Sequence, residues 1–316
     1  MPTPSGVLLI DKPSGVTSHD VVAAVRRLAG TRKVGHAGTL DPMATGLLTV
    51  GIGAGTRLLT YFSGQAKSYE ATIRLGAATS TEDADGELAL DTIGVCPDFD
   101  VADFDAALAG LTGDIMQRPS AVSAIKIDGE RAYDRVRAGE QVELAARPVT
   151  VHSFIRLGEP RASQIEFRPR NYIPVIEVDV AASVSAGTYI RALGRDVGAA
   201  LSMGAHLSKL RRIQVGDFKV GQAATMPELI KLVRAGEPLP IMPLAQAAAK
   251  VMPALGVTAE QATKLRQGQF IELETQPSSY PVALIAAAGG EANIELVAIA
   301  KARGRLTAPA TVFAHE

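Results

Sequence analysis

Residues 35–48 read GHAGTLDPMATGLL and surround a single carboxylate, that of Asp41, with small and turn-forming residues. Three glycines give the backbone conformational freedom in this stretch, and Pro42 disfavours helical geometry at the aspartate before it. A carboxylate fixed in a loop by such neighbours can act as a nucleophile, a general base or a metal ligand. The alternative is an ordinary turn in which Asp41 hydrogen-bonds its own backbone. The spacing alone leaves both interpretations open.

Strand and helix patterns lie on both sides of this loop. Residues 7–10 form a continuous apolar run, which is typical of a buried strand, and residues 18–28 carry their apolar side chains on one helical face. Ser18 is the expected N-cap of that helix, because its hydroxyl can accept a hydrogen bond from the first turn. Residues 68–75 alternate between apolar and polar side chains, which is the period of a strand, and the alternation places Tyr69 on the apolar side.

The rest of the chain is predicted to divide near a segment rich in proline and alanine, residues 238–253. Before it, residues 114–148 are polar, basic and turn-rich, which indicates an excursion from the core. Residues 157–173 are charged and contain two prolines, and they are interpreted as a mobile hairpin or loop. After the division, residues 250–316 combine one capped helix with several strand-like runs. They predict a small, mostly β module.

Composition limits the class of protein. The 316 residues are 47% hydrophobic and 21% charged, which is typical of a soluble globular protein with an ample core. No apolar run reaches membrane-spanning length, and the N-terminus lacks the pattern of a signal peptide. The single cysteine, Cys96, excludes an internal disulfide and a cysteine-rich metal site. These features favour the cytoplasm and no association with membranes.

The charge distribution is more informative than the net charge of −1. Residues 1–80 carry eight Lys and Arg against four Asp and Glu, and residues 187–219 carry six against two. Residues 82–114 carry ten acidic residues and no base, whereas the C-terminal module is neutral. Two basic segments on one face could follow a phosphate backbone, although charge segregation of this size also arises by chance.

Seven blocks of the sequence follow one another between residues 6 and 220: residues 6–13 (GVLLIDKP), 35–48, 67–71 (KSYEA), 79–86 (TSTEDADG), 118–126 (RPSAVSAIK), 187–191 (GTYIR) and 204–212 (GAHLSKLRR). In these blocks and in their order, the chain resembles the bacterial tRNA pseudouridine-55 synthase family, TruB, with an actinobacterial or mycobacterial character. The stretch 157–173 is longer than is expected for the family. The C-terminal module matches only in its size and β-rich character, in which it resembles an RNA-binding PUA-type domain.

The resemblance implies an α+β fold: a mixed, mainly antiparallel sheet flanked by helices, with a small C-terminal mostly-β, PUA-like module. Residues 1–240 are then the pseudouridine synthase catalytic domain. Residues 114–148 become an RNA-clasping insertion within it, and residues 250–316 become the C-terminal module.

The reaction that the resemblance implies breaks the N1–C1′ bond of uridine, turns the detached uracil and rejoins it through C5. It involves no redox step, so neither a cofactor nor a metal ion is needed. Asp41 matches the nucleophile of the family, and attack at C1′, addition to C6 and a glycal route all stay open. Arg191 matches the guanidinium that keeps this carboxylate ionised in a closed pocket. Tyr69 matches an aromatic residue that stacks on the flipped base and takes part in proton transfer, with a core tyrosine as the alternative.

Further residues are expected at the substrate. His36 is the candidate to occupy the space that the flipped uridine leaves. Tyr189 is expected to pack or hydrogen-bond near the pocket, and Leu210 is either an apolar wall against the base or a core residue. Lys12 either binds a phosphate or braces the Asp41 loop. The candidate phosphate contacts are Arg26, Arg27, Arg32, Lys33, Lys126, Lys209, Arg211 and Arg212.

Other patterns carry less weight. Arg195 has no family context and is interpreted as a surface residue. Residues 83–86 have part of the pattern of a calcium loop, but the downstream glutamate is missing. The five histidines lack the spacing of zinc ligands.

The sequence thus predicts a stand-alone, monomeric isomerase that acts on the T-arm stem-loop of tRNA at position 55, with no obligatory protein partner. One alternative is a guide-RNA-dependent relative, against which the lack of a lysine-rich tail and the short terminal module argue. A second is an RNA chaperone for tRNA folding in which binding is the main role. A third is a hydrolase with an aspartate nucleophile, which would release free uracil.

Overall fold

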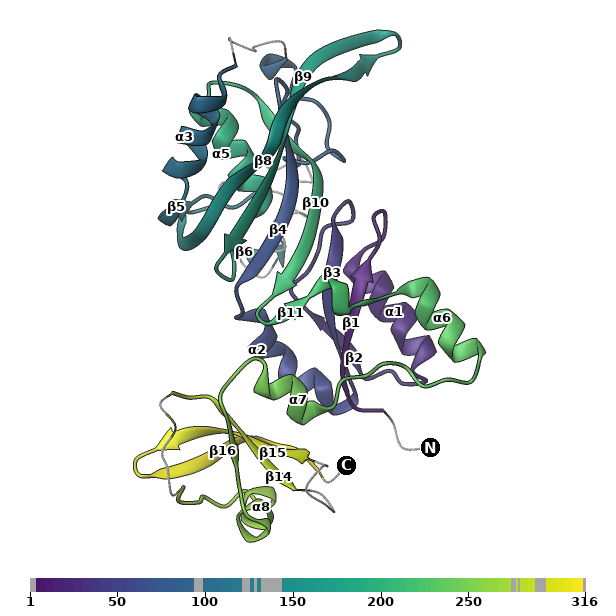
Figure 1. Ribbon diagram of the computed structural model, residues 1–316, viewed down its shortest axis with the longest axis vertical. Coiled ribbons are helices and arrows are strands. Elements are labelled where there is room, and N and C mark those ends of the chain that lie inside the picture. The colour runs from purple at the N-terminus through teal and green to yellow at the C-terminus, as the bar shows by residue number, and fades with distance from the viewer. Residues whose placement is uncertain are drawn as a thin grey trace. The chain divides into compact units, whose positions relative to one another are not determined.

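A computed structural model describes residues 4–93, 99–120, 126–127, 130–131, 144–273, 277, 279–287 and 294–314 (Figure 1). Its contacts divide the chain into two compact units, which are described separately. The N/C unit consists of Met1–Pro42, Gly46–Gln65 and Gln214–Glu316, and the central unit consists of Met43–Thr45 and Ala66–Ile213. Among the described residues, every helix is too short or too polar to span a lipid bilayer.

The N/C unit is built on strand β1 (Gly6–Lys12), which lies between two neighbours. It pairs antiparallel with β3 (Thr45–Ile52) on one side and parallel with the short β12 (Ala224–Thr225) on the other. Strand β2 (Val34–Ala37) pairs antiparallel with β3, along the edge of β3 that faces away from β1. The sheet is therefore mixed. The two strands of the parallel pair, β1 and β12, are separated by about two hundred residues of the chain.

Both faces of β1 are buried, which explains the continuous apolar run in the sequence. Leu8 and Ile10 pack beneath helices α1 (Ser18–Leu28) and α6 (Met226–Arg234). Val7 and Leu9 pack on the opposite face. That face is covered by η1 (Gly53–Leu58), α2 (Leu59–Ser63), β11 (Phe218–Lys219), η3 (Val220–Gln222) and α7 (Leu244–Ala249).

The cap of α1 differs from the prediction. Thr17, and not Ser18, is the N-cap: its hydroxyl accepts a hydrogen bond from the backbone N–H of Asp20 (3.1 Å), and the Asp20 carboxylate accepts one from the N–H of Thr17 (2.9 Å). This reciprocal arrangement is a capping box, which an acidic residue at the third helical position permits. Ser18 is thereby free to serve the neighbouring loop, as described below.

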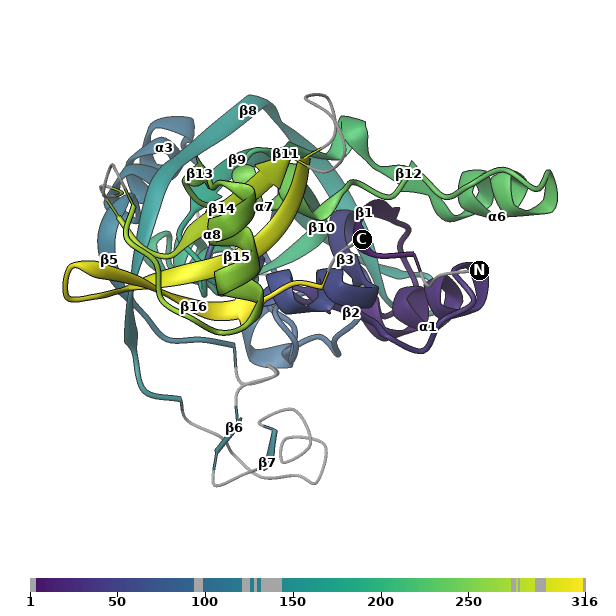
Figure 2. The same cartoon turned by 90° about the horizontal axis from the view of Figure 1, so that it is seen from below.

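The C-terminal part of the N/C unit contains a separate four-stranded sheet, in the order β13 (Ala254–Gly256), β14 (Val282–Ala287), β15 (Ile294–Arg303) and β16 (Leu306–Val312). Helix α8 (Ala259–Arg266) lies across one face, where Leu265 packs against Leu284 and Val297 (Figure 2). The predicted small, mostly β module is confirmed. The opposite face shares a hydrophobic cluster with β1 through Ile299 and Phe313, and a domain boundary at residues 240–250 stays a prediction.

The central unit contains a sheet of long antiparallel strands in the order β10 (Ala205–Val215), β4 (Lys67–Leu75), β9 (Asn171–Val184), β8 (Arg147–Arg168) and β5 (Gly113–Gln117). Helices α3 (Val101–Gly110) and α5 (Ile190–Ala200) lie together along it (Figure 1). Gly194 allows α5 to approach the sheet closely, because a Cβ there would lie 2.8 Å from the side chain of Leu207. A short 3-10 helix, η2 (Leu90–Thr92), precedes α3 in the chain.

The two units together confirm the predicted α+β class with a mixed, mainly antiparallel sheet. Residues 157–173 are the end of a continuous hairpin, since β8 runs to Arg168, β9 begins at Asn171 and Arg170 takes a positive φ of 66° in the turn. The predicted RNA-clasping insertion at 114–148 falls largely outside the described residues. Of its central part, the structure describes only the paired β6 (Lys126–Ile127) and β7 (Glu130–Arg131).

Candidate active site

The Asp41 loop, residues 38–44, connects β2 to β3 and is fixed through its backbone. The Ser18 hydroxyl accepts a hydrogen bond from the N–H of Leu40 (2.9 Å) and donates one to the carbonyl of the same residue (3.0 Å). On the other side of Asp41, the carbonyl of Pro42 accepts a hydrogen bond from the N–H of Gly15 (2.9 Å). The residues on both sides of the aspartate are therefore anchored, while Asp41 itself is partly exposed.

Lys12 is fully buried beside this loop. Its ammonium donates hydrogen bonds to the carbonyl oxygens of Pro13 (2.9 Å), Val16 (2.7 Å) and Pro42 (3.2 Å). Three acceptors match the three donors of an ammonium group, which offsets much of the cost of burying its charge. Of the two roles that the sequence left open for Lys12, the structure therefore provides the contacts of the brace.

His36 lies on strand β2, opposite Val50 of β3, and not in the loop in which the sequence placed it. The loop begins two residues later, at Gly38, which has a positive φ of 72°. The His36 ring meets that of His19 edge-to-face with 6.4 Å between centroids. A strand position orients this side chain more firmly than a glycine-bounded loop would.

Arg191 and Asp83 form a buried ion pair in the central unit. A guanidinium nitrogen (Nη1) of Arg191, on the first turn of α5, lies 3.2 Å from Oδ2 of Asp83, and the two side chains are 5% and 6% exposed. The same nitrogen donates a hydrogen bond to the carbonyl of Thr81 (2.6 Å). Asp83 also accepts hydrogen bonds from the Thr81 hydroxyl and from the N–H of Asp85. These contacts fix the Asp83 carboxylate, which in turn holds the guanidinium of Arg191 in one orientation.

Sequence reasoning missed Asp83 as a functional candidate. It noticed the residue only within an incomplete calcium-loop pattern, although residues 79–86 were also one of the seven matching blocks. Within the described residues, no group of three or more His, Cys, Asp or Glu side chains is placed to hold a metal ion. The carboxylate of Asp83 instead forms an ion pair with Arg191 of α5, more than a hundred residues later in the chain.

Arg195, interpreted from the sequence as a surface residue, has 30% of its side chain exposed and is also held by the same loop. Its guanidinium lies 2.6 Å from the Glu82 carboxylate, contacts Asp196 and donates a hydrogen bond to the carbonyl of Arg118 (2.8 Å). Glu82 takes a positive φ of 62°, a conformation that costs a non-glycine residue about 1–2 kcal/mol. Two arginines one helical turn apart thus hold three successive loop residues, which fixes the partner of Arg191 in place.

The other predicted pocket residues of the central unit have defined positions. Tyr69 lies on β4 opposite Ala182 of β9 and is buried, and Leu210 on β10 is equally buried. Both alternatives therefore stay open for each residue: base stacking or a core position for Tyr69, and an apolar wall or a core position for Leu210. Tyr189 precedes α5. Its backbone exchanges two hydrogen bonds with the side-chain amide of Gln117, at 2.9 and 3.0 Å, and the guanidinium of Arg147 lies 5.0 Å from the centre of its ring.

The predicted phosphate contacts divide by exposure. Arg32, Lys33 and Lys209 are exposed, whereas Arg211 is partly buried and donates a hydrogen bond to the Thr45 hydroxyl (3.4 Å). Arg212 differs from all of these: it is only 1% exposed, so the structure places it in the interior and away from the surface that a phosphate backbone would touch. Arg211 and Arg212 are neighbours on strand β10, so their side chains point to opposite faces of the sheet, and the face that carries Arg212 is the buried one.

Lys67, at the start of β4, is buried near the guanidinium of Arg212. Burial and the positive charge of Arg212 lower the pKa of the Lys67 ammonium from 10.5 to about 8. Both effects disfavour the charged form in the folded protein. Between pH 8 and 10.5 the unfolded chain therefore binds more protons at this group than the folded chain, and stability from this group rises with pH.

This shift predicts a pH-dependent difference between the wild type and Lys67→Met. The free energy of unfolding of the wild type, measured relative to that of the variant, should rise between pH 7 and 10.5 by on the order of 2–3 kcal/mol. Urea unfolding at several pH values measures this difference, with Lys33→Met, which removes an exposed ammonium, as the matched control. A difference that is constant or falls with pH would contradict the assignment.

Comparison with known proteins identifies the family. Residues 26–190 match the TruB family pseudouridylate synthase N-terminal domain, and residues 191–239 match the tRNA pseudouridylate synthase B C-terminal domain. A protein of Arthrobacter sp. (strain FB24) named tRNA pseudouridine synthase B is 47% identical over 317 residues, which cover 98% of this chain and 97% of that protein. A protein of Thermobifida fusca (strain YX) with the same name is 48% identical and covers 98% of both chains. The chain belongs to the TruB family of pseudouridine synthases.

Solved structures support the fold. The chain superimposes with a TM-score of 0.70 on a chain in the structure of an H/ACA RNP bound to a substrate RNA containing 2′-deoxyuridine, at 23% identity and covering 98% of this chain and 85% of the other. It superimposes with a TM-score of 0.65 on a chain in a Cbf5–Nop10–Gar1 complex, at 25% identity and covering 94% and 78%. These structures confirm the predicted pseudouridine synthase fold, and the family match together with the named relatives confirms the predicted isomerase class.

Proposed function

We propose that this chain is a tRNA pseudouridine synthase that isomerises uridine-55 in the T loop of tRNA, alone, as a monomer and in the cytoplasm. The observation that carries the proposal is the anchored Asp41 loop, in a chain that resembles proteins named tRNA pseudouridine synthase B over nearly its whole length. Ser18 and Lys12 anchor the backbone of this loop. Such preorganisation is what a nucleophile needs before the substrate arrives.

Each candidate residue has a role in this proposal. Asp41 is the nucleophile, and Arg191, which Asp83 holds in one orientation, is the catalytic guanidinium. Tyr69 stacks on the flipped uracil and takes part in the final proton transfer. His36 occupies the space that the uridine vacates. Tyr189 and Leu210 line the pocket.

The RNA is held through its phosphates and its loop shape. Arg32, Lys33 and Lys209 are exposed and suit this role, and Arg211 and Lys126 are the further candidates. Lys12 acts through the loop that it braces. Arg212 has no place in this set, because a buried guanidinium does not reach the RNA backbone.

The guide-RNA-dependent alternative draws on the fold alone, which the chain shares with proteins of H/ACA complexes. Identity to those chains is about half of the identity to the proteins named tRNA pseudouridine synthase B. A stand-alone enzyme therefore has the stronger support. The chaperone alternative concerns binding and is compatible with catalysis by the same site.

The test combines the purified chain with an unmodified tRNA transcript that carries tritium at C5 of its uridines, and with no other component. We expect tritium release of about one equivalent per tRNA, because pseudouridine formation replaces the C5 proton by the glycosidic bond. A transcript with cytidine at position 55 is the matched control and should release none. Release only after another RNA or protein is added would favour the guided enzyme. Release from the control transcript would show a different target position.

A further inference from the structure

The end of the β8–β9 hairpin carries charged and aromatic residues that have no role in the proposed catalytic site. We define the distal ribbon as residues 161–177, paired from Arg161 opposite Glu177 to Arg168 opposite Asn171. Strand β4 stops pairing with β9 at Ile176, so the distal ribbon continues as two strands beyond the edge of the wider sheet and extends from the central unit (Figure 1). An isolated two-stranded ribbon is marginally stable in water, so this one needs anchors.

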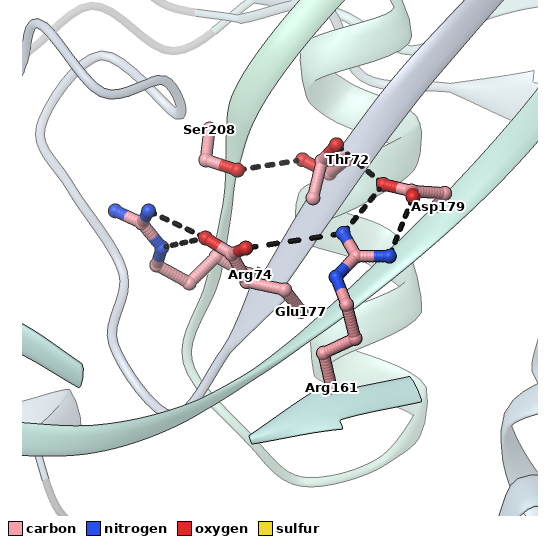
Figure 3. Close-up of polar contacts among 6 residues, drawn as sticks. All are labelled: Thr72, Arg74, Arg161, Glu177, Asp179 and Ser208. Carbon is pink, nitrogen blue, oxygen red and sulfur yellow. Dashed lines mark hydrogen bonds and ion pairs between the residues drawn. The ribbon is translucent and has the colours of Figure 1, made fainter. Parts of the chain in front are cut away.

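A polar network anchors the root of the ribbon (Figure 3). Arg161 of β8 donates hydrogen bonds to both carboxylate oxygens of Asp179 on β9, at 2.6 and 3.0 Å, and lies 3.9 Å from Glu177. Two residues of β4 join them: Thr72 donates to Asp179 (2.6 Å) and Arg74 donates twice to Glu177 (2.6 and 3.0 Å). The hydrogen bonds from Arg161 and Thr72 keep the pKa of Asp179 below its ordinary value. Three strands are thus cross-linked where the ribbon leaves the sheet.

One face of the ribbon is also buried. Ile173 and Val175 are 5% and 2% exposed, and Val175 lies close to Gly76 at the end of β4. The opposite face is exposed, and Tyr172 on it has 54% of its surface accessible. The ribbon therefore has a fixed root and a fixed inner face. Its outer face and its tip are left to solvent.

The tip differs from the root in its charges. The root arginines are paired with carboxylates, whereas the guanidinium groups of Arg168 and Arg170 at the tip have no ion pair within the part of the chain that the structure describes, and both residues are exposed. Arg168 lies over the ring of Phe167, with 4.9 Å between the guanidinium carbon and the ring centre. The nearby acid, Glu166, accepts a hydrogen bond from the backbone N–H of Arg170 (3.0 Å). Two positive groups are thus presented outward.

Arginines of this kind beside an exposed tyrosine fit RNA. A guanidinium binds phosphate oxygens in a bidentate manner, and an exposed aromatic ring can stack on an unpaired base. A protein partner would call for a contiguous apolar surface, whereas at the tip the charged residues Glu166, Arg168 and Arg170 separate the apolar and aromatic ones, Phe167, Pro169 and Tyr172. The distance between the tip and Tyr69 sets a minimum length for an RNA that would reach both. Asn171 at the tip and Ala182, which pairs with Tyr69, are eleven residues apart on β9, or about 36 Å at the usual rise of a strand.

We propose that the tip of the distal ribbon binds the phosphate backbone of tRNA outside the T loop, through Arg168 and Arg170. An RNA that reaches both this tip and a pocket at Tyr69 must extend well beyond the flipped uridine and its loop. The inference rests on the proposed function, because it takes tRNA as the substrate. It adds a second contact that a short stem-loop lacks.

The test compares the double variant Arg168→Gln/Arg170→Gln with the wild type in two binding series, one with an unmodified full-length tRNA transcript and one with a T-arm stem-loop. Affinity is measured by fluorescence anisotropy between 50 and 200 mM salt. For tRNA we expect the affinity of the double variant to be about tenfold lower. The slope of log affinity against log salt should be smaller in magnitude by about 1.4–1.8, since each of the two lost phosphate contacts contributes about 0.7–0.9 to the slope. Affinity for the stem-loop and the rate at saturating tRNA should be unchanged.

Two further variants separate a specific contact from general charge. Arg168→Lys/Arg170→Lys keeps both charges and should retain most of the salt dependence. Lys231→Gln/Arg234→Gln removes two exposed charges from α6 and is the matched control, with an unchanged slope expected. Unchanged tRNA binding by the glutamine double variant, as a protein-binding ribbon would give, overturns the proposal. So does an equal loss for tRNA and stem-loop, or for the α6 control.

The failure of this inference can be told apart from the failure of the proposed function. The proposed function fails if the wild type releases no tritium from tRNA by itself. The ribbon inference fails if the wild type is active and the glutamine double variant binds tRNA as the wild type does. Because the two substituted side chains are exposed at a turn, the fold of the central unit should be retained, and circular dichroism verifies it.

Discussion

Asp41→Asn should abolish pseudouridine formation while leaving the protein folded. An amide of the same shape cannot act as a carboxylate nucleophile, and loss of a nucleophile lowers kcat by at least about 10³-fold. The loop should keep its position, because it is held through the backbone of its neighbours by Ser18, Gly15 and Lys12. Tritium release from a T-arm stem-loop labelled at C5 of uridine measures the effect. Unfolding in urea measures whether the fold is retained.

The matched control is Asp217→Asn, which removes an exposed carboxylate from a turn of the same unit. It should leave the rate within about twofold of the wild type, as surface substitutions usually do. A rate for Asp41→Asn within tenfold of the wild type would remove Asp41 from the role of nucleophile. If the inactive variant still assists the folding of tRNA, binding is a function in its own right and the chaperone alternative gains support.

Asp83→Ala should weaken both stability and catalysis. The side chains of Asp83 and Arg191 are 6% and 5% exposed, so removal of the carboxylate leaves a buried guanidinium without its ion partner in the loop. Breaking a buried pair in this way costs about 3–5 kcal/mol. Arg191 is also released from one orientation, and a displacement of about 1 Å at a catalytic group can cost about 10²-fold in rate. Urea unfolding and tritium release measure the two effects.

Two companion variants distinguish charge from shape. Asp83→Asn keeps the side-chain volume and one acceptor oxygen for the Thr81 hydroxyl and the N–H of Asp85, so it should retain more stability than Asp83→Ala while still losing activity. Asp85→Asn removes the exposed acid two residues away and is the matched control, with little change expected. Wild-type stability and activity in Asp83→Ala would show that Arg191 is positioned without this carboxylate.

Local features of the protein could be predicted because their causes lie within a few residues. The apolar run of β1, the alternation of β4 and the capped helix α8, which begins after Thr258, all follow from side chains that are near one another in the chain. Even here, the predicted N-cap of α1, Ser18, is wrong by one residue, since the cap is Thr17. The reason is that either hydroxyl suits a helix start, and the position of Asp20 decides between them.

The sequence by itself determined the family, the α+β class, the small C-terminal sheet and the loop around Asp41, because motifs and periodicity are carried by neighbours in the chain. Only the tertiary structure decided that Asp83 holds Arg191, that Lys12 braces the Asp41 loop, that Arg212 is buried and that the distal ribbon ends in arginines without ion partners among the described residues. These facts depend on which distant segments pack together; Arg191, for example, meets a carbonyl 110 residues before it. Burial and pairing are properties of that packing, so they set the charge and orientation of a side chain in ways that no local pattern records.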